Sequence, residues 1–566
     1  MSTVTMSTVT ADLAEAARAR TGTAATVRAR YEWLWIALLA LTAVAPYLST
    51  LRYGFVYDDR PQIVENHELL SLAGIPRFFG ESISKGVGFQ NAAQPVFYRP
   101  LFFTQLCLTR GLFGPGPLGF HLVSLLLQVG NTLLLFFTAI WLGVSRRAAY
   151  LAGMLFAVHP VHVESVAWAS ASPDLMALAG VLGSLLTLLI GEASARNAVR
   201  LSWKTVSVFS FLAALFVKET ALVTLPLIAV VGLFRMRART STLRNAAAEI
   251  AAYLGAAVFY LAARIHVLHG AVSTVTRTSW LDMARTWPTV LWFYERHLIL
   301  PMHTSLLYDY DLVEHANWTA FWMPLAAVLA TFAALAILLC RYRTPATLIS
   351  VLLIVVPILL VLNFRVFYWG DLVHDRYLYV PSAGFCILAA MALCEMGRRF
   401  ESTISPVAQR ILAAALVCGM GTMTVAQAQP WKNNLLLLAN AAKTAPRNIA
   451  AQILLGDELE ARNNFAEAKI CYELALELTP AWAPAWFAYG RTLLLTHDAE
   501  AAVQSLQRAI VLGDSPIIRV WLAVAFEATG RHAEAQSALT VAVAKDPGTL
   551  QAYADVRKRL QSSPAK

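Results

Sequence analysis

The sequence has few charged residues. Asp, Glu, Lys and Arg make up only 14% of the 566 residues, whereas soluble domains carry about 25%. Hydrophobic residues account for 58% and are gathered into long runs. These features exclude a string of ordinary soluble domains, which the length alone would favour, and they indicate an integral membrane protein.

Cysteine is also scarce, and its spacing carries no metal or redox motif. The six cysteines show no CxxC pair, and most lie in or beside apolar runs, where Cys behaves as a small hydrophobe. We therefore expect no disulfide framework and no metal site built on cysteine. The formal net charge of +10 does not indicate nucleic-acid binding, because the basic residues lie in short loops between the apolar runs.

A membrane-spanning helix needs roughly 20 mostly apolar residues. Eleven stretches are candidates: 33–51, 119–142, 148–166, 174–191, 203–217, 220–234, 246–265, 318–340, 346–362, 378–397 and 409–427. The first is long enough to remain as a span, and the residues before it lack the compact charged start of a cleavable signal peptide. We expect an all-α polytopic membrane helix bundle over residues 33–429, preceded by a cytoplasmic segment, 1–32.

Basic residues collect in alternate loops. They are Arg18, Arg20, Arg28, Arg30, Arg146, Arg147, Arg196, Arg200, Lys204, Arg235, Arg237, Arg239, Arg244, Arg341, Arg343, Arg398, Arg399 and Arg410. The positive-inside rule places these loops in the cytoplasm. The remaining loops, including the long first one at 52–118, and the region 430–566 are then extracytoplasmic.

After about residue 430 the pattern changes to short amphipathic helices with small residues at a fixed spacing. Gly456 and Gly490 are 34 residues apart, as are Ala475 and Ala509, and Ala542 follows 33 residues later. A period of 34 is that of the tetratricopeptide repeat (TPR). We expect an extracytoplasmic TPR domain over 430–566, an α-solenoid of three units and a capping helix, which binds a protein partner or acceptor.

Two adjacent carboxylates, Asp58 and Asp59, follow the first span in "YGFVYDDRPQIVENHELL". They are solvated caps of a helix that starts just after them, or they are chemical groups. Arg99, Lys218 and Arg376 fall on the same predicted side of the membrane. A carboxylate among separated cations suits a reaction between a hydroxyl and a lipid-linked phosphate, because the carboxylate takes the proton and the cations stabilise the departing phosphate.

Several motifs occur in a specific order along the chain. They are "FVYDDRPQIVEN" (55–66), "FYRPL" (97–101), "GFHLVSLLLQ" (119–128), "LFAVHPVHVESVAWASASPDLMA" (155–177), "VKET" (217–220) and "HDRYLYVPSAGF" (374–385). With the repeats, this order resembles the transmembrane and tetratricopeptide-repeat O-mannosyltransferases, the TMTC family of the GT-C glycosyltransferase superfamily. The resemblance implies a GT-C fold. It also implies transfer of a sugar, usually mannose, from a polyprenyl-phosphate carrier to Ser or Thr hydroxyls of proteins on the non-cytoplasmic side.

The resemblance also implies roles for single residues. It makes Asp58 the base of an inverting reaction, with Asp59 orienting the acceptor or positioning Asp58. The substrate-binding candidates are Tyr98, Arg99, His159, His162, Glu164, Lys218, Glu219, Asp375 and Arg376. His159, His162 and Glu164 fit a structural hydrogen-bonded cluster equally well, and Asp174 fits a helix cap. The residues show no metal-ligand spacing, so no cofactor is firmly expected, although a divalent cation is used by some members of the superfamily.

Other functions remain open at this point. The acceptor could be a glycan or lipid instead of a protein, or the chain could be a non-catalytic TPR membrane scaffold. A scaffold would have lost the acids or the cations, and this sequence keeps both. A transporter would favour charges at the middle of the bilayer and inverted repeats, which the spans lack. The short repeat array and the compact, alanine-rich loops favour a protein of the bacterial inner membrane.

Overall fold

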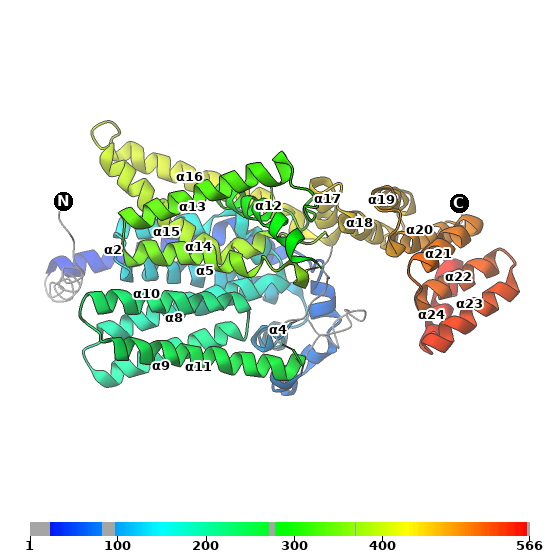
Figure 1. Ribbon diagram of the computed structural model, residues 1–566, viewed down its shortest axis with the longest axis horizontal. Coiled ribbons are helices and arrows are strands. Elements are labelled where there is room, and N and C mark those ends of the chain that lie inside the picture. The colour runs from blue at the N-terminus through cyan, green and yellow to red at the C-terminus, as the bar shows by residue number, and fades with distance from the viewer. Residues whose placement is uncertain (1–22, 82–96, 271–277, 368–369, 563–566) are drawn as a thin grey trace. The chain divides into compact units, whose positions relative to one another are not determined.

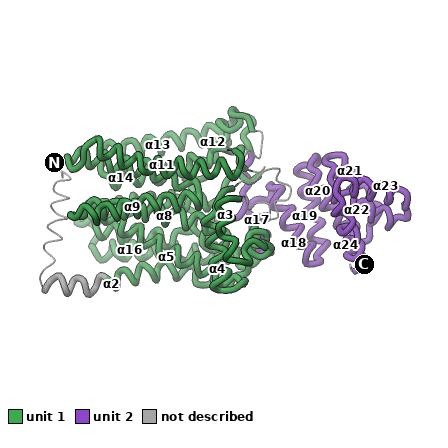
Figure 2. Tube along the Cα trace, turned by 90° about the horizontal axis from the view of Figure 1, so that it is seen from below, with its two compact units in different colours: residues 1–304, 312–433 green, residues 305–311, 434–566 purple. Residues whose placement is uncertain are grey.

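Helices make up all of the regular structure in the computed structural model, which describes residues 23–81, 97–270, 278–367 and 370–562, with only the backbone at 23–32. The predicted cytoplasmic segment 1–32 therefore lies mostly outside the described residues. The chain forms two compact units (Figure 2). Unit 1 is 1–304 with 312–433, and unit 2 is 305–311 with 434–566. The expectation of an all-α fold is confirmed.

Unit 1 is a bundle of long helices that lie side by side along one direction (Figure 1). Its main helices are α2 (Thr23–Val44), η1 (Ala45–Arg52), α4 (Pro100–Phe113), α5 (Pro117–Trp141), α6 (Arg146–Ala157), α8 (Ser172–Ala193), α9 (Asn197–Leu215), α10 (Thr224–Arg237), α11 (Leu243–Leu268), α12 (Trp280–Ile299), α13 (Met323–Arg341), α14 (Pro345–Leu360), α15 (Tyr379–Arg399) and α16 (Pro406–Ala428).

Nine helices in the described part of the chain are long and apolar enough to cross a membrane. They are Trp33–Arg52, Pro117–Trp141, Ala169–Ala193, Asn197–Leu215, Glu219–Arg237, Leu243–Leu268, Trp318–Arg341, Asp375–Arg399 and Pro406–Lys432. Each coincides with one of the eleven expected spans. The protein is therefore built as an integral membrane protein.

The other two expected spans, 148–166 and 346–362, form shorter helices, α6 with 12 residues and α14 with 16. Proline explains the short α6, because Pro160 has no N–H and disfavours helical geometry at the residue before it. After Ala157 the chain continues instead as two short helices, η6 (Pro160–His162) and α7 (Val163–Ala167). This break places buried polar side chains inside the bundle.

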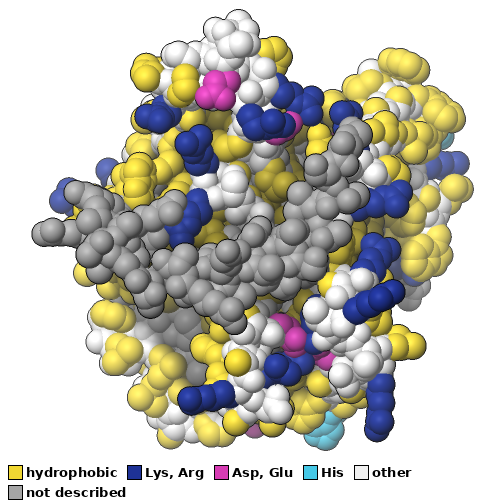
Figure 3. Space-filling view, turned by 90° about the vertical axis from the view of Figure 1, so that its left-hand side faces the viewer, with side chains coloured by type: hydrophobic (Ala, Val, Ile, Leu, Met, Phe, Trp, Pro, Cys, Tyr) yellow, Lys and Arg dark blue, Asp and Glu magenta, His cyan; other side chains and the backbone are white. Residues whose placement is uncertain are grey.

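The two ends of the bundle differ in chemistry. One end holds the loops that join α8 to α9, α10 to α11 and α15 to α16. Figure 3 looks onto this end, where dark blue Lys and Arg side chains are spread over the face and magenta Asp and Glu side chains are few. The candidate site lies at the other end, where η1 and α9 end and where α8 and α15 begin. Which end faces the cytoplasm stays a prediction.

Unit 2 consists of paired helices. They are α17 (Asn434–Thr444), α18 (Ile449–Ala461), α19 (Phe465–Leu478), α20 (Ala483–Leu495), α21 (Ala499–Leu512), α22 (Pro516–Ala528), α23 (His532–Lys545) and α24 (Thr549–Ser562). Close approach within pairs explains the small residues at the 34-residue spacing. A Cβ on Gly456 would lie 2.5 Å from the ring of Tyr472, and one on Gly490 would lie 2.9 Å from Leu506.

Candidate active site at one end of the helix bundle

A strained turn carries the two adjacent carboxylates. Tyr57 has a φ of 48°, a left-handed backbone conformation that is rare for a large side chain and costs about 1–2 kcal/mol. The turn lies between η1 and a short π-helix, Arg60–Val64. Such strain persists only where neighbouring contacts hold the backbone in place, and it is concentrated at functional sites.

Asp59 supplies those contacts. Its side chain is completely buried. It accepts hydrogen bonds from the N–H of Val56 at 3.0 Å, the N–H of Ser170 at 2.8 Å and the hydroxyl of Ser170 at 2.6 Å. Burial raises the pKa of Asp59 to about 7, and the bonds from Ser170 and Val56 oppose this shift. Asp59 thus links the turn to the start of the Ala169–Ala193 span through hydrogen bonds. Because its carboxylate is completely buried, it cannot contact a substrate.

Asp58, in contrast, keeps part of its surface exposed. Gln62 donates a hydrogen bond of 3.3 Å to one of its carboxylate oxygens. Burial raises the pKa of Asp58 to about 6, the positive charge of Arg376 opposes the shift, and the negative charge of Asp371 adds to it. A carboxylate with a pKa close to the working pH is what general base catalysis requires.

Glu164, which is buried, and Arg376, which is partly buried, form an ion pair near Asp58. The carboxylate of Glu164, on α7, accepts from the guanidinium of Arg376 and from its backbone N–H at 2.9 Å. The ring of His374 lies 3.8 Å from Glu164 and 3.0 Å from Asp371. The break between α6 and α7 and the short helix η11 (Asp375–Leu378) bring these groups together across more than 200 residues of sequence.

Two aromatic rings contact the guanidinium of Arg376. The guanidinium lies 5.3 Å from the ring of Trp168 and 5.2 Å from that of Tyr377. Trp168 itself contacts the ring of Tyr57 at 5.8 Å and stacks on Trp431 at 6.0 Å. These cation–π contacts add to the ion pair with Glu164 in holding the guanidinium in place.

Lys218 joins the cluster from the turn between α9 and α10. Its ammonium group forms an ion pair with Asp174 in the first turn of α8, and it lies 5.0 Å from the ring of Tyr377. Asp174 therefore pairs with a cation, whereas the sequence also allowed a simple helix cap. Tyr377 is shared by Lys218 and Arg376, so the two cations occupy neighbouring places.

A second group of charges adjoins Lys218. Glu219 forms an ion pair with Arg264 on α11, and its other oxygen lies 3.9 Å from Arg99 at the start of α4. Two cations share one carboxylate here, so this group carries a net positive charge. Arg99 is the less tightly held of the two cations, because its distance from Glu219 is long for an ion pair.

Several of the expected substrate-binding residues are buried and bonded to other parts of the protein core. Tyr98 donates a hydrogen bond of 2.9 Å to the carbonyl of Phe79 and packs on Tyr260. A ring nitrogen of His159 lies 3.1 Å from the carbonyl of Leu298, and one of His162 lies 2.7 Å from the hydroxyl of Ser382. These contacts join separate helices, as expected if the two histidines belong to a structural hydrogen-bonded cluster. Asp375 is also completely buried, at the start of η11.

Sequence reasoning missed several members of the cluster: Tyr57, Trp168, Arg264, Asp371, His374 and Tyr377. Tyr57, Trp168, His374 and Tyr377 lie inside the motifs that carried the resemblance, but nothing in the sequence alone separated them from their neighbours. Arg264 had an independent signal. It is a lone arginine within the expected span 246–265, and an ionisable residue inside a span is functional by default.

Within the described residues, no group of three His, Cys, Asp or Glu side chains is arranged to hold a metal ion. The sequence left the use of a divalent cation open, and it stays open here.

Comparison with known sequences agrees with the two-unit architecture. Residues 449–481, which contain α18 and α19, match the tetratricopeptide repeat model. Human protein O-mannosyl-transferase TMTC1 is 27% identical over 520 residues, covering 82% of this chain and 57% of the relative. Mouse TMTC3 is 24% identical over 527 residues, covering 86% and 56%, and Tmtc1 of Drosophila melanogaster is 25% identical over 536 residues, covering 78% and 61%.

The resemblance to the TMTC family is confirmed. The chain spans about three fifths of the length of these relatives. The relatives named here are animal proteins, so they give no support to the expectation of a bacterial origin. The names of the TMTC relatives describe the transfer of a sugar to proteins. In this chain, the cluster around Asp58 contains the groups that such a reaction would need.

Proposed function

We propose that this chain is a glycosyltransferase that moves a sugar from a polyprenyl-phosphate carrier to Ser or Thr hydroxyls of proteins. The observation that carries the proposal is Asp58, a partly exposed carboxylate with a raised pKa beside a set of oriented cations. The names of the relatives support the class of reaction and the protein acceptor. Mannose is the sugar that those names suggest.

In the proposed reaction the acceptor oxygen attacks the anomeric carbon from the face opposite the phosphate. The new carbon–oxygen bond forms as the bond between the anomeric carbon and the phosphate oxygen breaks, and the phosphate leaves with the electron pair. Asp58 receives the hydroxyl proton. One displacement of this kind inverts the configuration of the anomeric carbon and needs no covalent intermediate.

The uneven distribution of charge supports one orientation of the donor. Arg99, Arg264 and Glu219 together carry a net positive charge, which suits the phosphate. Arg376 and Lys218 are each balanced by a carboxylate, whereas Asp58 and Asp371 add negative charge near Arg376. Positive charge that develops on the sugar in the transition state is then stabilised by these carboxylates.

The location of the cluster suits a lipid-linked donor. Its residues lie at the ends of the apolar helices Trp33–Arg52, Ala169–Ala193, Asn197–Leu215 and Asp375–Arg399. At the edge of the membrane, a ligand with an apolar tail and a charged head group satisfies both environments. We propose that this end faces away from the cytoplasm.

The test is a single-turnover transfer assay in nanodiscs with polyprenyl-phosphate mannose and a Ser/Thr-rich acceptor peptide. Asp58→Asn keeps the shape of the side chain but cannot take the proton, so transfer should fall at least about 100-fold. Donor binding should survive, because cations hold the phosphate. The matched control is Glu65→Gln, an exposed acid in the same loop, which should transfer normally. Transfer at the wild-type rate by Asp58→Asn would remove Asp58 from the mechanism.

A further inference from the structure

Helix α24 of unit 2 packs differently from the helices before it. The repeats pair α18 with α19, α20 with α21 and α22 with α23. Against the preceding pair, α20 packs mainly on its second helix, α19, and α22 likewise packs mainly on α21. If α24 continued this pattern it would lie mainly on α23. It packs mainly on α22 instead, and both ribbon views place α24 beside α22 (Figures 1 and 2).

The contacts of α24 reach the first helix of each of the three pairs: α18, α20 and α22. Arg559 donates to Glu460 on α18 at 2.9 Å, although the two are 99 residues apart. Arg557 lies 3.4 Å from Glu527 on α22, and the hydroxyl of Tyr553 donates to the same carboxylate. The helix also touches α20. It therefore runs across the face that α18, α20 and α22 form together.

This face is where a helical solenoid normally binds an extended ligand. Here α24 covers it with an aliphatic side chain, Val556, buried against the repeats. Arginines on the same helix meet carboxylates on the face. The segment that lies on the face thus presents an aliphatic side chain followed by arginines.

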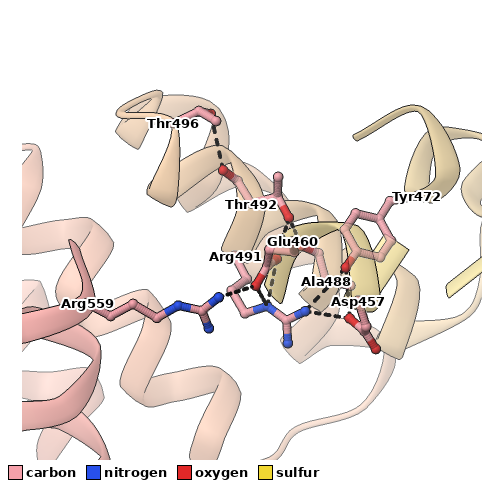
Figure 4. A network of polar contacts seen from close by, with 8 residues as sticks. All are labelled: Asp457, Glu460, Tyr472, Ala488, Arg491, Thr492, Thr496 and Arg559. Carbon is pink, nitrogen blue, oxygen red and sulfur yellow. Dashed lines mark hydrogen bonds and ion pairs between the residues drawn. The ribbon is translucent and has the colours of Figure 1, made fainter. Parts of the chain in front are cut away.

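The polar network around Glu460 does not depend on Arg559 alone (Figure 4). Glu460 is buried, with 2% of its side chain exposed. Besides Arg559 it accepts hydrogen bonds from Arg491 at 3.0 Å and Thr492 at 2.6 Å, both on α20. When Arg559 leaves, Glu460 keeps these two partners. Removing α24 therefore leaves no unpaired buried charge, which would otherwise make the loss of a partner very costly.

We infer that α24 is a displaceable strap over the binding face of the repeats, and that this face takes a polypeptide segment of the same chemistry as α24. The inference rests on the repeats alone and does not require transferase activity. A tethered helix competes at a high effective concentration, so the apparent affinity for any such segment is the intrinsic affinity multiplied by the fraction of time that the strap is open.

The experiment uses the full chain in detergent and a fluorescent peptide with the sequence of residues 549–562, TLQAYADVRKRLQS. Arg559→Glu in the chain places a negative charge against Glu460 and should loosen the strap. The peptide should then bind at least about tenfold more tightly to this variant than to the wild type. Lys558→Glu is the matched control, because Lys558 is exposed on the same helix and undergoes the same charge change, and it should behave as wild type.

Hydrogen exchange separates a strap from an integral part of the fold. In the Arg559→Glu chain, amides of α24 should exchange faster while those of α22 and α23 stay protected. A peptide carrying Arg559→Glu should fail to bind the loosened chain. Equal peptide affinity for the three chains would overturn the inference. So would a loss of protection that spreads through α22 and α23, since α24 would then be a cap that the repeats need in order to fold.

Discussion

At the scale of single residues, Asp58 and Asp59 divide two tasks between adjacent positions. Asp59 is surrounded by donors and holds the backbone, and this leaves Asp58 partly exposed beside Arg376. Sequence reasoning could single out the pair, because two acids directly after a span are unusual. The resemblance made Asp58 the base but left Asp59 open between orienting the acceptor and positioning Asp58, because the hydrogen bonds from Ser170 come from 111 residues further along the chain.

The raised pKa of Asp58 predicts how transfer depends on pH. The carboxylate must be ionised to accept a proton, and its pKa is about 6. The single-turnover rate should therefore be constant above pH 7 and fall about tenfold for each pH unit below 6. The pH profile of Asp58→Asn is the control. Its residual rate should be flat over this range, and the same fall in Asp58→Asn would assign the titration to another group.

Substitution of Asp59 should affect stability before it affects chemistry. Asp59→Ala removes the acceptor for the N–H of Val56 and for two donors of Ser170. Buried donors left without partners cost about 1–3 kcal/mol each, so the free energy of unfolding should fall by at least about 2 kcal/mol. Thermal unfolding in detergent measures this. Asp58→Asn should leave the unfolding temperature nearly unchanged, and equal losses in both variants would contradict the division of tasks.

At the scale of elements, local patterns predicted most helices but not their lengths. Long apolar runs give long helices, so nine of the expected spans have counterparts in the structure. Apolar runs do not show where a helix stops when the interruption is a His–Pro pair, as after α6. The partners of His159 and His162 were likewise out of reach, because Leu298 and Ser382 are 139 and 220 residues away.

The repeat spacing gives a prediction for the paired helices. Gly456→Ala places a methyl group 2.5 Å from the ring of Tyr472, which is itself fully buried. The two helices must separate, and overpacking of this kind costs about 1–3 kcal/mol. Urea unfolding of the full chain, monitored by hydrogen exchange in α18 and α19, measures the loss. Gly419→Ala on α16 is the control, because its Cβ would have no atom within 4 Å, and it should not destabilise the protein.

At the scale of the whole molecule, the distribution of charge between the two ends of the bundle predicts its orientation. The arginine-rich loops should face the cytoplasm and the repeats should face the opposite side. Thr240→Cys and Ser537→Cys are exposed reporter positions, to be introduced after the exposed Cys340 and Cys418 are replaced by Ser. An impermeant maleimide added to sealed cells should label position 537 once any outer barrier is opened, and should label position 240 only after lysis. Labelling of both positions from one side would contradict the orientation.

The composition of unit 2 has a consequence for synthesis on the ribosome. Residues 305–311 belong to this unit, and the partners of Asp309 and Tyr308, the backbone N–H of Arg447 and the side chain of Asn448, come 138 and 140 residues later. At about 5–20 residues per second, translation takes roughly 7–28 seconds to cover that distance. Four further apolar helices emerge in that interval: α13, α15 and α16, which are long enough to cross a membrane, and the shorter α14. The seven-residue segment must therefore remain accessible while the membrane part of the chain is inserted.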